Sequence, residues 1–367
     1  MASAAARPDE IPEGAACFIT TTHRPITEVT TGLNPEGALV DEPSDRAYVT
    51  CSRSHELTVI ELATLSVVGH IPVGQEPTDT AIDNLTRRLF ACDLRSSSVT
   101  VIDLDSEQPE ASLDVPPYPS SLTIDEQRRL LYCGCAAGAS VAVIDVDELR
   151  VLATVPAELG AGGTAVDEQR QIGYCANFLT GSMTVFDCRT RQPVDRIELG
   201  RAPCSAMVNE ANDSLYVVNS GADALLRIDL ATRRPVAEIP VGRGPVGIHS
   251  SASGDRIYTG NRGEGTVSVV GAADDREWAR FPVGEAPAGL ALDERRNRLL
   301  VSNAGSGTVT VLEDLLTGPA QRLEDPPHPL VGRPLPPFEL LDLKTGRLRH
   351  SREWSERKYI LNFFASW

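Results

Sequence analysis

Short apolar segments alternate with polar turns along most of the chain. Near the middle, the segments SAMVNE, SLYVVNS, ALLRIDL and PVAEIPVG follow one another, and the breaks between them are rich in Asn, Asp, Ser and Gly. Breaks of this composition favour hairpins over helix starts. The pattern therefore predicts four consecutive strands joined by tight turns, with almost no helix.

This four-strand unit repeats every 42 residues without an insertion or deletion. The second strand of each unit carries a large apolar residue at the same position: Tyr48, Phe90, Tyr132, Tyr174, Tyr216, Tyr258 and Leu300. The first strand opens on Pro35, Pro77, Pro119, Ala161, Pro203, Pro245 and Pro287, and Pro329 stands one period further on. Repeats of this length with several short strands are typical of β-propeller blades, whereas solenoids of helix pairs show 3.6-residue apolar spacing.

Seven units account for residues 35–328, so the sequence predicts an all-β fold, a seven-bladed β-propeller of four-stranded antiparallel blades. We expect the propeller to span residues 17–323 and residues 1–16 to be irregular or disordered. Residues 17–32 align with the last two strands of a unit. They either replace the outer strands of the seventh blade and close the ring, or start an irregular eighth blade; we favour closure.

The words YVTCS, YVVNS, YTGNR and LVSNA, followed by TV(I/F)D and VGxxP, resemble the YVTN family of β-propeller repeats. That family is related in architecture to lactonase-like seven-bladed proteins. The resemblance covers about four fifths of the chain and implies the fold. It implies function only loosely, because YVTN propellers serve as surface, binding and sometimes enzymatic modules.

Acidic residues outnumber basic ones, 51 against 34, which gives a net charge of −17. Such a surface repels nucleic-acid phosphates and anionic lipid, so we expect no nucleic-acid or membrane partner. No apolar run reaches the ~18 residues that span a bilayer. The first sixteen residues lack the apolar core of an export signal, which predicts a cytoplasmic protein as written, or a periplasmic or secreted one if the start codon is misassigned.

The eight cysteines show no spaced CxxC pair, so we expect no zinc site, no other metal and no cofactor. Cys133 and Cys135 stand two apart on one predicted strand and point to the same face. The CGC word suggests a metal or redox site, but small apolar side chains packed between blades explain it better. The cysteine pattern mildly favours a reducing compartment.

Two polar columns recur once per blade and are interpreted as structural. Glu61, Asp103, Asp145, Asp187 and Asp229 stand where the third strand turns, and we expect their carboxylates to accept backbone N–H groups there. Asn177, Asn219, Asn261 and Asn303 end the second strand, where Asn caps a turn or adopts a left-handed backbone.

The loops that join blades and the loops between second and third strands are expected on one face around the channel. The candidate ligand residues on this face are Arg53, His55, Arg95, Arg201, Arg243 and Arg262. This group of cations suits a small anionic ligand or an acidic peptide, or a protein partner. The alternative is that they are solvated charges that balance Glu76, Glu264 and Glu285. His249 stands alone in a channel column of small and apolar residues, and packing explains it better than a ligand role.

After residue 323 the repeat ends. Residues 324–331 form a Pro-rich linker, and residues 332–367 follow a different pattern, with a hairpin-like FELLDLKTGRLR and a continuous apolar strand, YILNFF. This segment resembles the opening of thioredoxin-like redoxin domains of the AhpC/TSA group. The matching residues are Gly332, Pro334, Pro336, Pro337, Phe338, Leu340, Asp342, Gly346, Trp354, Lys358 and Asn362 to Trp367.

In that family the residue after this final Trp is the nucleophilic cysteine of a Cys-x-x-Cys pair, and the helix that follows lowers its pKa. The resemblance therefore implies an incomplete thioredoxin-like α/β domain with no catalytic residue in the chain itself. The nucleophile is expected immediately after Trp367, as cysteine or as selenocysteine encoded by UGA; ordinary truncation is the rival explanation. Without the missing helix and sheet, we expect residues 332–367 to be poorly packed or loosely attached.

Two functional classes follow. In the first, the intact gene product is a propeller that recognises a partner, fused to a thiol-disulfide or peroxide-reducing oxidoreductase that acts with a redox partner protein. In the second, the chain is a non-enzymatic binding or scaffold propeller. A lactonase-like hydrolase is a third class, for which the six scattered histidines supply no convergent acid, base and metal set.

Overall fold

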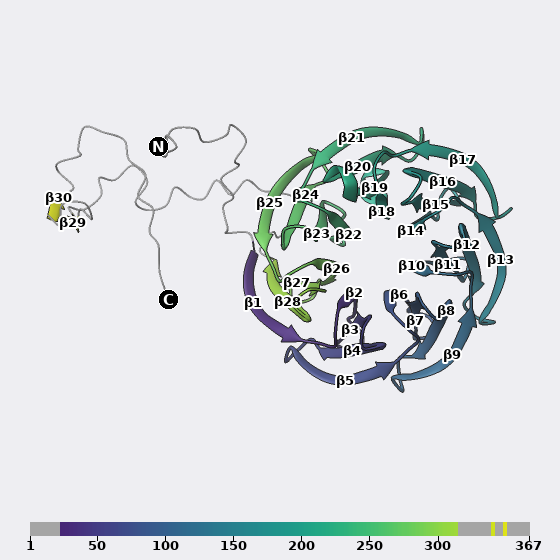
Figure 1. The fold of residues 1–367 in the computed structure, drawn as a ribbon, viewed down its shortest axis with the longest axis horizontal. Helices are drawn as coiled ribbons and strands as arrows, with labels where there is room; N and C mark the ends of the chain where they lie inside the picture. Colours follow the sequence, from purple (N-terminus) through teal and green to yellow (C-terminus); the bar gives the residue numbers. More distant parts are fainter. Residues whose placement is uncertain (1–22, 315–338, 342–347, 351–367) are drawn as a thin grey trace, which may run out of the picture. The chain divides into compact units, whose positions relative to one another are not determined.

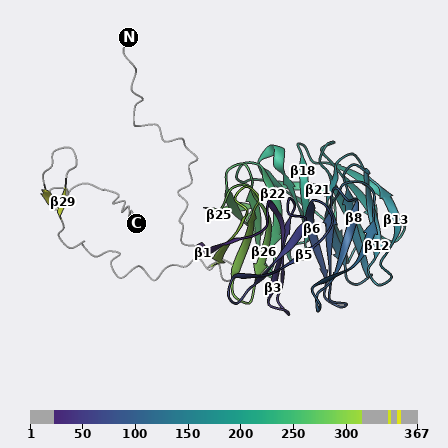
Figure 2. The same cartoon turned by 60° about the horizontal axis from the view of Figure 1, so that its bottom comes forward.

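The computed structural model describes residues 23–314, 339–341 and 348–350. The chain divides into two compact units, Met1–Gly318 and Pro319–Trp367. The described part of the first unit is a ring of seven four-stranded antiparallel sheets around a central channel, shown in Figure 1 and, turned, in Figure 2. This confirms the predicted all-β, seven-bladed propeller of four-stranded antiparallel blades.

Each blade runs outward from the channel in chain order. Blades 1 to 3 are β2 (Pro35–Asp41), β3 (Arg46–Cys51), β4 (Glu56–Glu61) and β5 (Ser66–Pro72); β6 (Pro77–Asp83), β7 (Arg88–Asp93), β8 (Ser98–Asp103) and β9 (Gln108–Asp114); and β10 (Pro119–Asp125), β11 (Leu130–Cys135), β12 (Ser140–Asp145) and β13 (Arg150–Pro156). Blades 4 and 5 are β14 (Ala161–Asp167), β15 (Ile172–Asn177), β16 (Ser182–Asp187) and β17 (Gln192–Glu198); and β18 (Pro203–Asn209), β19 (Ser214–Asn219), β20 (Ala224–Asp229) and β21 (Arg234–Pro240), with short 3₁₀ turns η1 (Glu210–Asn212) and η2 (Ser220–Ala222). Blade 6 is β22 (Pro245–Ser250), β23 (Arg256–Asn261), β24 (Thr266–Gly271) and β25 (Arg276–Pro282).

The seventh blade joins the two ends of the propeller. Its inner strands are β26 (Pro287–Asp293), β27 (Arg298–Asn303) and β28 (Thr308–Asp314), and its outermost strand is β1 (His23–Thr30), paired antiparallel to β28. Within the described residues the N-terminal segment therefore contributes one strand to the seventh blade and closes the ring. The seventh repeat keeps its own third strand, β28, so only the outermost position is taken over. Residues 17–22 lie outside the described part.

The core lies between neighbouring blades. The aromatic column of the second strands is buried throughout, with Tyr48, Phe90 and Tyr132 at 0 % exposure. Seven clusters of buried side chains fill the spaces between sheets, and one of them packs Phe90 and Val101 of blade 2 against Leu131 and Ile144 of blade 3. Neighbouring blades cover both faces of each sheet, which explains why nearly every residue of a third strand is buried, polar ones included, as in SVTVID of β8.

Ion pairs join blades at the lower face, defined here as the side where first and second strands turn. Asp83 of blade 2 has 0 % exposure and accepts bidentate hydrogen bonds from the guanidinium of Arg129 in blade 3, with Nη1 to Oδ1 at 2.6 Å. Burial alone would raise the pKa of Asp83, but the bonds from Arg129 and Thr86 lower it below its ordinary value. Asp41 and Arg87 repeat the arrangement between blades 1 and 2.

The acidic column at the third-strand turn behaves as predicted for its aspartates. Asp187 Oδ1 accepts the backbone N–H groups of Arg189 and Thr190 at 2.9 and 2.7 Å, and Asp103, Asp145 and Asp229 accept equivalent bonds. Glu61 differs, because its longer carboxylate accepts the Thr64 hydroxyl instead.

The asparagine column has another role than the one predicted. Asn177, Asn261 and Asn303 do not adopt a left-handed backbone; the left-handed residue is the glycine that ends the following turn, as at Gly265, with φ of 68°. These amides are fully buried and donate to two hydroxyls on the third strand, as Asn261 does to Thr266 and Ser268 at 2.9 and 2.8 Å. The amides connect the second strand to the third, because alternate residues of a strand share one face and this places the amides beside those hydroxyls.

The second unit is described only as a hairpin. β29 (Glu339–Leu341) pairs antiparallel with β30 (Leu348–His350), which agrees with the hairpin predicted from FELLDLKTGRLR. The predicted strand YILNFF and the linker of residues 324–331 lie outside the described residues, and no α/β fragment is shown there. In the described part of the chain, no helix is long and apolar enough to cross a membrane.

Candidate ligand channel

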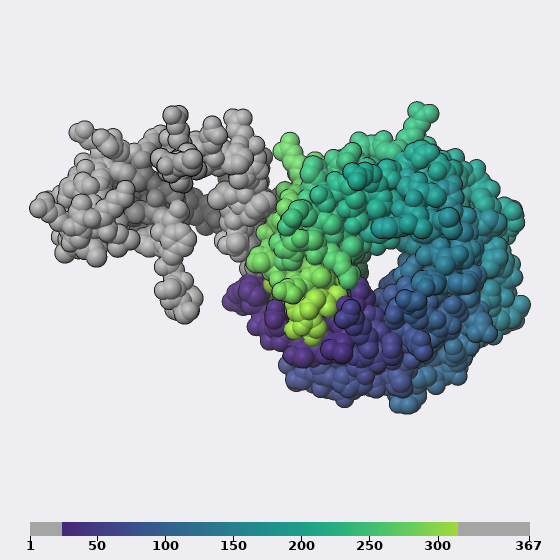
Figure 3. Space-filling model, in the orientation of Figure 1, coloured from purple at the N-terminus to yellow at the C-terminus, as the bar shows by residue number. Residues whose placement is uncertain are grey.

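The seven innermost strands line a channel at the centre of the ring, which Figure 3 shows as an opening. It contains a cavity of about 570 Å³. This is within the size range of small-molecule sites. Each strand runs from the upper face, where the blade-joining loops lie, toward the lower face. The residues two positions after the opening proline column form one layer of the channel, and all but Gly163 line the cavity: Gly37, Asp79, Ser121, Gly163, Ser205, Gly247 and Gly289.

Glycine in this layer allows the inner strands to approach one another closely. A Cβ on Gly37 would lie 2.7 Å from the carbonyl oxygen of Thr78, and one on Gly163 would lie 2.4 Å from the Cα of Ser205. Both distances are shorter than van der Waals contact, so a side chain there would push the blades apart. The layer therefore has side chains in only three blades, and the cavity is lined unequally.

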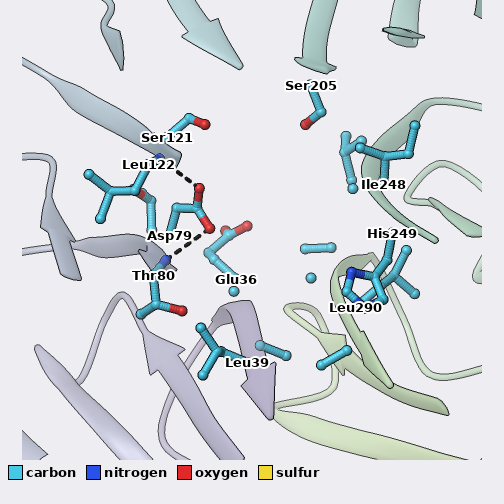
Figure 4. A pocket seen from close by; sticks show the side chains of 18 of the residues that line it. Glu36, Leu39, Asp79, Thr80, Ser121, Leu122, Ser205, Ile248, His249 and Leu290 are labelled. Carbon is cyan, nitrogen blue, oxygen red and sulfur yellow. Dashed lines mark hydrogen bonds between the residues drawn. The ribbon is translucent and has the colours of Figure 1, made fainter. Parts of the chain in front are cut away.

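One wall of the cavity is polar and comes from blades 2 to 4. Asp79 Oδ1 accepts the backbone N–H of Thr80 at 2.8 Å, and its Oδ2 accepts that of Leu122 in the next blade at 2.9 Å, as Figure 4 shows. Ser121 repeats the second bond, since its hydroxyl accepts the backbone N–H of Thr164 at 3.2 Å. Desolvation raises the pKa of Asp79 above its ordinary value, against the lowering effect of these bonds.

The opposite wall comes from blades 6, 7 and 1 and is mostly apolar, with Glu36, His249 and Arg262 as its polar side chains. Ile248, Leu290 and Leu39 point into the cavity from this side, with His249 among them (Figure 4). Desolvation by the channel wall lowers the pKa of His249 to about 4. The ring is only half-buried, so water in the channel limits the effect, and both considerations leave the imidazole neutral at pH 7. His249 therefore lines the channel. From the sequence, a packing role had been favoured for this residue.

An ion pair lies at the upper mouth. Arg262, on the turn between β23 and β24, donates to Glu36 at the start of β2, with Nη1 to Oε2 at 2.8 Å and Nη2 to Oε1 at 3.1 Å. The pair joins blade 6 to blade 1 across the inner end of blade 7. Of the six predicted ligand residues, Arg262 lines the cavity.

The other five predicted residues lie on the loops around that mouth, on the expected face. The blade-joining and second-to-third-strand loops contact one another there, since the backbone N–H of Glu76 donates to His55 Nδ1 at 3.1 Å. Arg95 pairs with Glu76 at 3.2 Å and donates to the Tyr118 hydroxyl at 2.9 Å, and its guanidinium also lies over the Tyr118 ring. Arg243 pairs with Glu264 at 3.6 Å.

Arg53, in blade 1, and Arg201, at the junction of blades 4 and 5, form no ion pair within residues 23–314. The three paired arginines and two unpaired ones are thus spread around the ring. Two of the pairings, those with Glu76 and Glu264, are the ones expected if these charges are structural.

Buried thiols gather between blades 2 and 3. The Cys92 and Cys133 sulfurs are 3.9 Å apart and those of Cys133 and Cys135 4.0 Å, inside an apolar cluster with Phe90 and Val99. Desolvation raises the pKa of Cys92 to about 11. All seven described cysteines are free thiols. A protonated thiol in an apolar cluster behaves as a small hydrophobic side chain, which matches the expected packing role.

The described residues contain no group of three or more His, Cys, Asp or Glu side chains that could hold a metal ion. Asp79 was not predicted as a site residue, although the repeat offered a signal: it is the one acid in a layer of glycine and serine. Asp93 was missed in the same way. It occupies the position that Asn177, Asn219, Asn261 and Asn303 hold in other blades.

No known protein-family model matches the sequence, and no curated protein matches it. Among solved structures, the chain is similar to a chain of the hydrazine synthase of Kuenenia stuttgartiensis, with 18 % sequence identity and a TM-score of 0.68. The alignment covers 80 % of this chain and 98 % of that chain. At such identity the similarity shows the propeller fold alone.

Proposed function

We propose that the propeller is a recognition module whose ligand enters the central channel from the upper face. The observation that supports this most is the contrast between the two walls of the cavity, one with Asp79 and hydroxyl groups and the other mostly apolar. Small-molecule sites commonly combine an apolar lining with a few placed polar groups. The YVTN-like repeat words point the same way, because propellers of that family include binding modules.

In this proposal the intact gene product also contains a thioredoxin-like domain that exchanges thiols and disulfides or reduces peroxide. The support is the resemblance of residues 332–367 to the start of redoxin domains, most of which lies outside the described residues. The nucleophile, cysteine or selenocysteine, follows Trp367. In this proposal the propeller selects the partner on which the redox domain acts.

The charge of the ligand is the point on which the sequence-based proposal and the geometry differ. A small anion or acidic peptide, bound by the arginines of the upper face, would compete with Glu36, Glu76 and Glu264 for three of the guanidinium groups. Arg53 and Arg201 remain available to an acidic partner on the rim. The recognition proposal itself requires only that the channel be the binding site.

A plug in the channel tests the recognition proposal. A library of small metabolites is screened by thermal shift against the full chain, and hits are measured by calorimetry on Ser205→Trp, which places an indole into the cavity. Val194→Trp is the matched control, because Val194 is half exposed on the outermost strand β17. We expect Ser205→Trp to abolish binding and Val194→Trp to retain it. Hits that bind both variants equally would place the ligand elsewhere.

The redox proposal has a separate test. The DNA after the Trp367 codon is read, and a product extended through it is assayed for dithiol reductase and peroxidase activity. We expect an in-frame UGA or a cysteine codon followed by a coding sequence for a redoxin fold, and activity that disappears when the nucleophile is replaced by serine. An inactive extended product, or a frame without such a domain, would leave the non-enzymatic binding or scaffold propeller.

A further inference from the structure

We infer that the channel binds a small organic cation, an ammonium group carried on an apolar stem, with the Asp79 carboxylate as its counter-ion. The inference rests on the proposed recognition function and names the chemical class of its ligand. It follows from a comparison of equivalent positions in the seven blades.

The structural role of Asp79 needs no charge. Its Oδ2 accepts the N–H of Leu122 in the next blade, and one blade further on the Ser121 hydroxyl accepts the N–H of Thr164 in the same way. Four other blades have glycine at this position and no side-chain bond at all. A serine would therefore complete the ring at blade 2 as well. The carboxylate adds a negative charge at the cavity wall that the inter-blade bond does not require.

No cation among the described residues pairs with this carboxylate. The partners of Asp79 are the backbone N–H groups of Thr80 and Leu122 and the nearby Ser121, none of which is a cation. Five titratable side chains line the cavity, namely Glu36, Asp79, Cys204, His249 and Arg262. Glu36 and Arg262 pair with each other, and Cys204 and His249 are neutral at pH 7, so the net charge of the cavity is that of the ionised Asp79 carboxylate.

A partly desolvated carboxylate gains most from a cation that brings its own hydrogen-bond donors. The described residues supply no second and third ligand for a metal ion. An ammonium group needs only the one carboxylate and hydroxyl acceptors, which Ser121 and Thr123 supply on the same wall. Across the cavity, Ile248, Leu290 and Leu39 offer an apolar surface for the stem. The volume of about 570 Å³ accommodates a ligand of this kind.

The test measures binding of hexylammonium to the full chain by calorimetry at pH 7.5 and low salt. Hexanol and hexanoate have the same stem without charge and with the opposite charge. We expect both to bind at least tenfold more weakly than hexylammonium. Equal affinity for hexylammonium and hexanol would overturn the inference, because the stem alone would then account for binding.

Two variants give the inference its structural control. Asp79→Ser keeps an acceptor for the Leu122 N–H and removes the charge, so it should retain the wild-type thermal midpoint within a few degrees and lose at least tenfold in affinity for hexylammonium. Asp105→Ser removes an acid of the lower face whose side chain is 78 % exposed, and should change neither. Unchanged affinity in a folded Asp79→Ser protein would refute the role of Asp79.

The outcomes separate this inference from the proposed function. If a ligand from the general screen is lost on Ser205→Trp but bound normally by Asp79→Ser, the channel is a recognition site and its ligand is not a cation held by Asp79. N-acetyl-lysine methylamide distinguishes the source of the ammonium group. Tighter binding of this peptide analogue than of hexylammonium would indicate a lysine side chain of a protein partner, and weaker binding a free amine; either result supports the inference.

Discussion

Replacing Asp93 by asparagine should stabilise the propeller at neutral pH. Asp93 ends β7, has 0 % exposure and occupies the column that holds Asn in four other blades. Its Oδ2 accepts hydrogen bonds from the hydroxyls of Ser98 and Thr100 at 3.1 and 2.6 Å, and no cation in the described part of the chain pairs with it. Desolvation raises the pKa of Asp93 from 3.8 to about 6 despite these bonds. An amide would make both contacts as a donor, as Asn177 does with Ser182 and Thr184.

The magnitude follows from proton linkage. The folded state holds the Asp93 proton up to about pH 6, whereas the unfolded chain releases it near 3.8, so stability falls as pH rises through this window. A difference of roughly two pKa units corresponds to about 3 kcal/mol, at 1.36 kcal/mol per unit. Above pH 7 the wild-type protein bears this full cost. Asp93→Asn removes it, and the expected gain in unfolding free energy is about 1 to 3 kcal/mol at pH 7.5 and close to zero at pH 4.

Urea unfolding followed by far-ultraviolet circular dichroism at pH 4, 5, 6 and 7.5 measures this difference. The reciprocal change, Asn261→Asp, should lower stability at pH 7.5 and have little effect at pH 4. Asp103→Asn is the opposite-sign control, because bonds from Ser106 lower the pKa of Asp103 and its loss should reduce stability above pH 4. A pH-independent difference between Asp93→Asn and wild type would refute the reasoning.

Three further predictions concern the ring. Arg129→Ala should lower the free energy of unfolding at pH 7.5 by about 3 to 5 kcal/mol, since it leaves the buried Asp83 carboxylate without its cation; urea unfolding measures this, and adding Asp83→Asn should recover part of the loss. Deleting residues 1–30 should cause self-association, visible by light scattering during size-exclusion chromatography, because β28 becomes an unpaired edge. In a chain with Cys17→Ser and Cys204→Ser, Ellman's reagent at pH 7.5 should modify the six buried propeller thiols only after unfolding, since they lie in the core, where desolvation raises the pKa of Cys92 to about 11.

Each of these has an opposing outcome. A loss under 1 kcal/mol in Arg129→Ala would mean that solvent or another group compensates Asp83. A monomeric deletion variant with an unchanged unfolding midpoint would show that β1 is not needed to close the ring. A propeller thiol that reacts within minutes in the native protein would identify a local opening of its blade.

Periodicity carried most of the fold prediction. The column from Tyr48 to Leu300 recurs because every blade buries the same position against its neighbour, so one repeat predicts the environment of the others. The hydrogen bonds of the aspartates at the third-strand turns were also predictable, because their partners are backbone N–H groups only two or three residues further along the chain. The role of Asn261 was not, because its partners lie on the next strand and depend on register across a turn.

The candidate site depends on departures from the repeat, which is why the sequence analysis identified little of it. Asp79 and Asp93 differ from the rest of their columns, and that difference is visible in the sequence, but only the structure shows that one faces the channel and the other the core. The charges of the upper face were predicted on the correct loops. Their ion pairs were predicted only in part. Glu36 and Arg262 are 226 residues apart in the chain, so their contact depends on the closed ring and not on local sequence.

The pairing of β1 with β28 means that the first strand is synthesised long before its partner. His23 pairs with Asp314, 291 residues later. At 5 to 20 residues per second, β1 leaves the ribosome about 15 to 60 s before its partner strand. During that interval its backbone groups are exposed to every other strand in reach. Its composition discourages premature pairing with other strands. Pro25 lacks a backbone N–H donor, and Arg24 and Glu28 bring charges of both signs to the open strand.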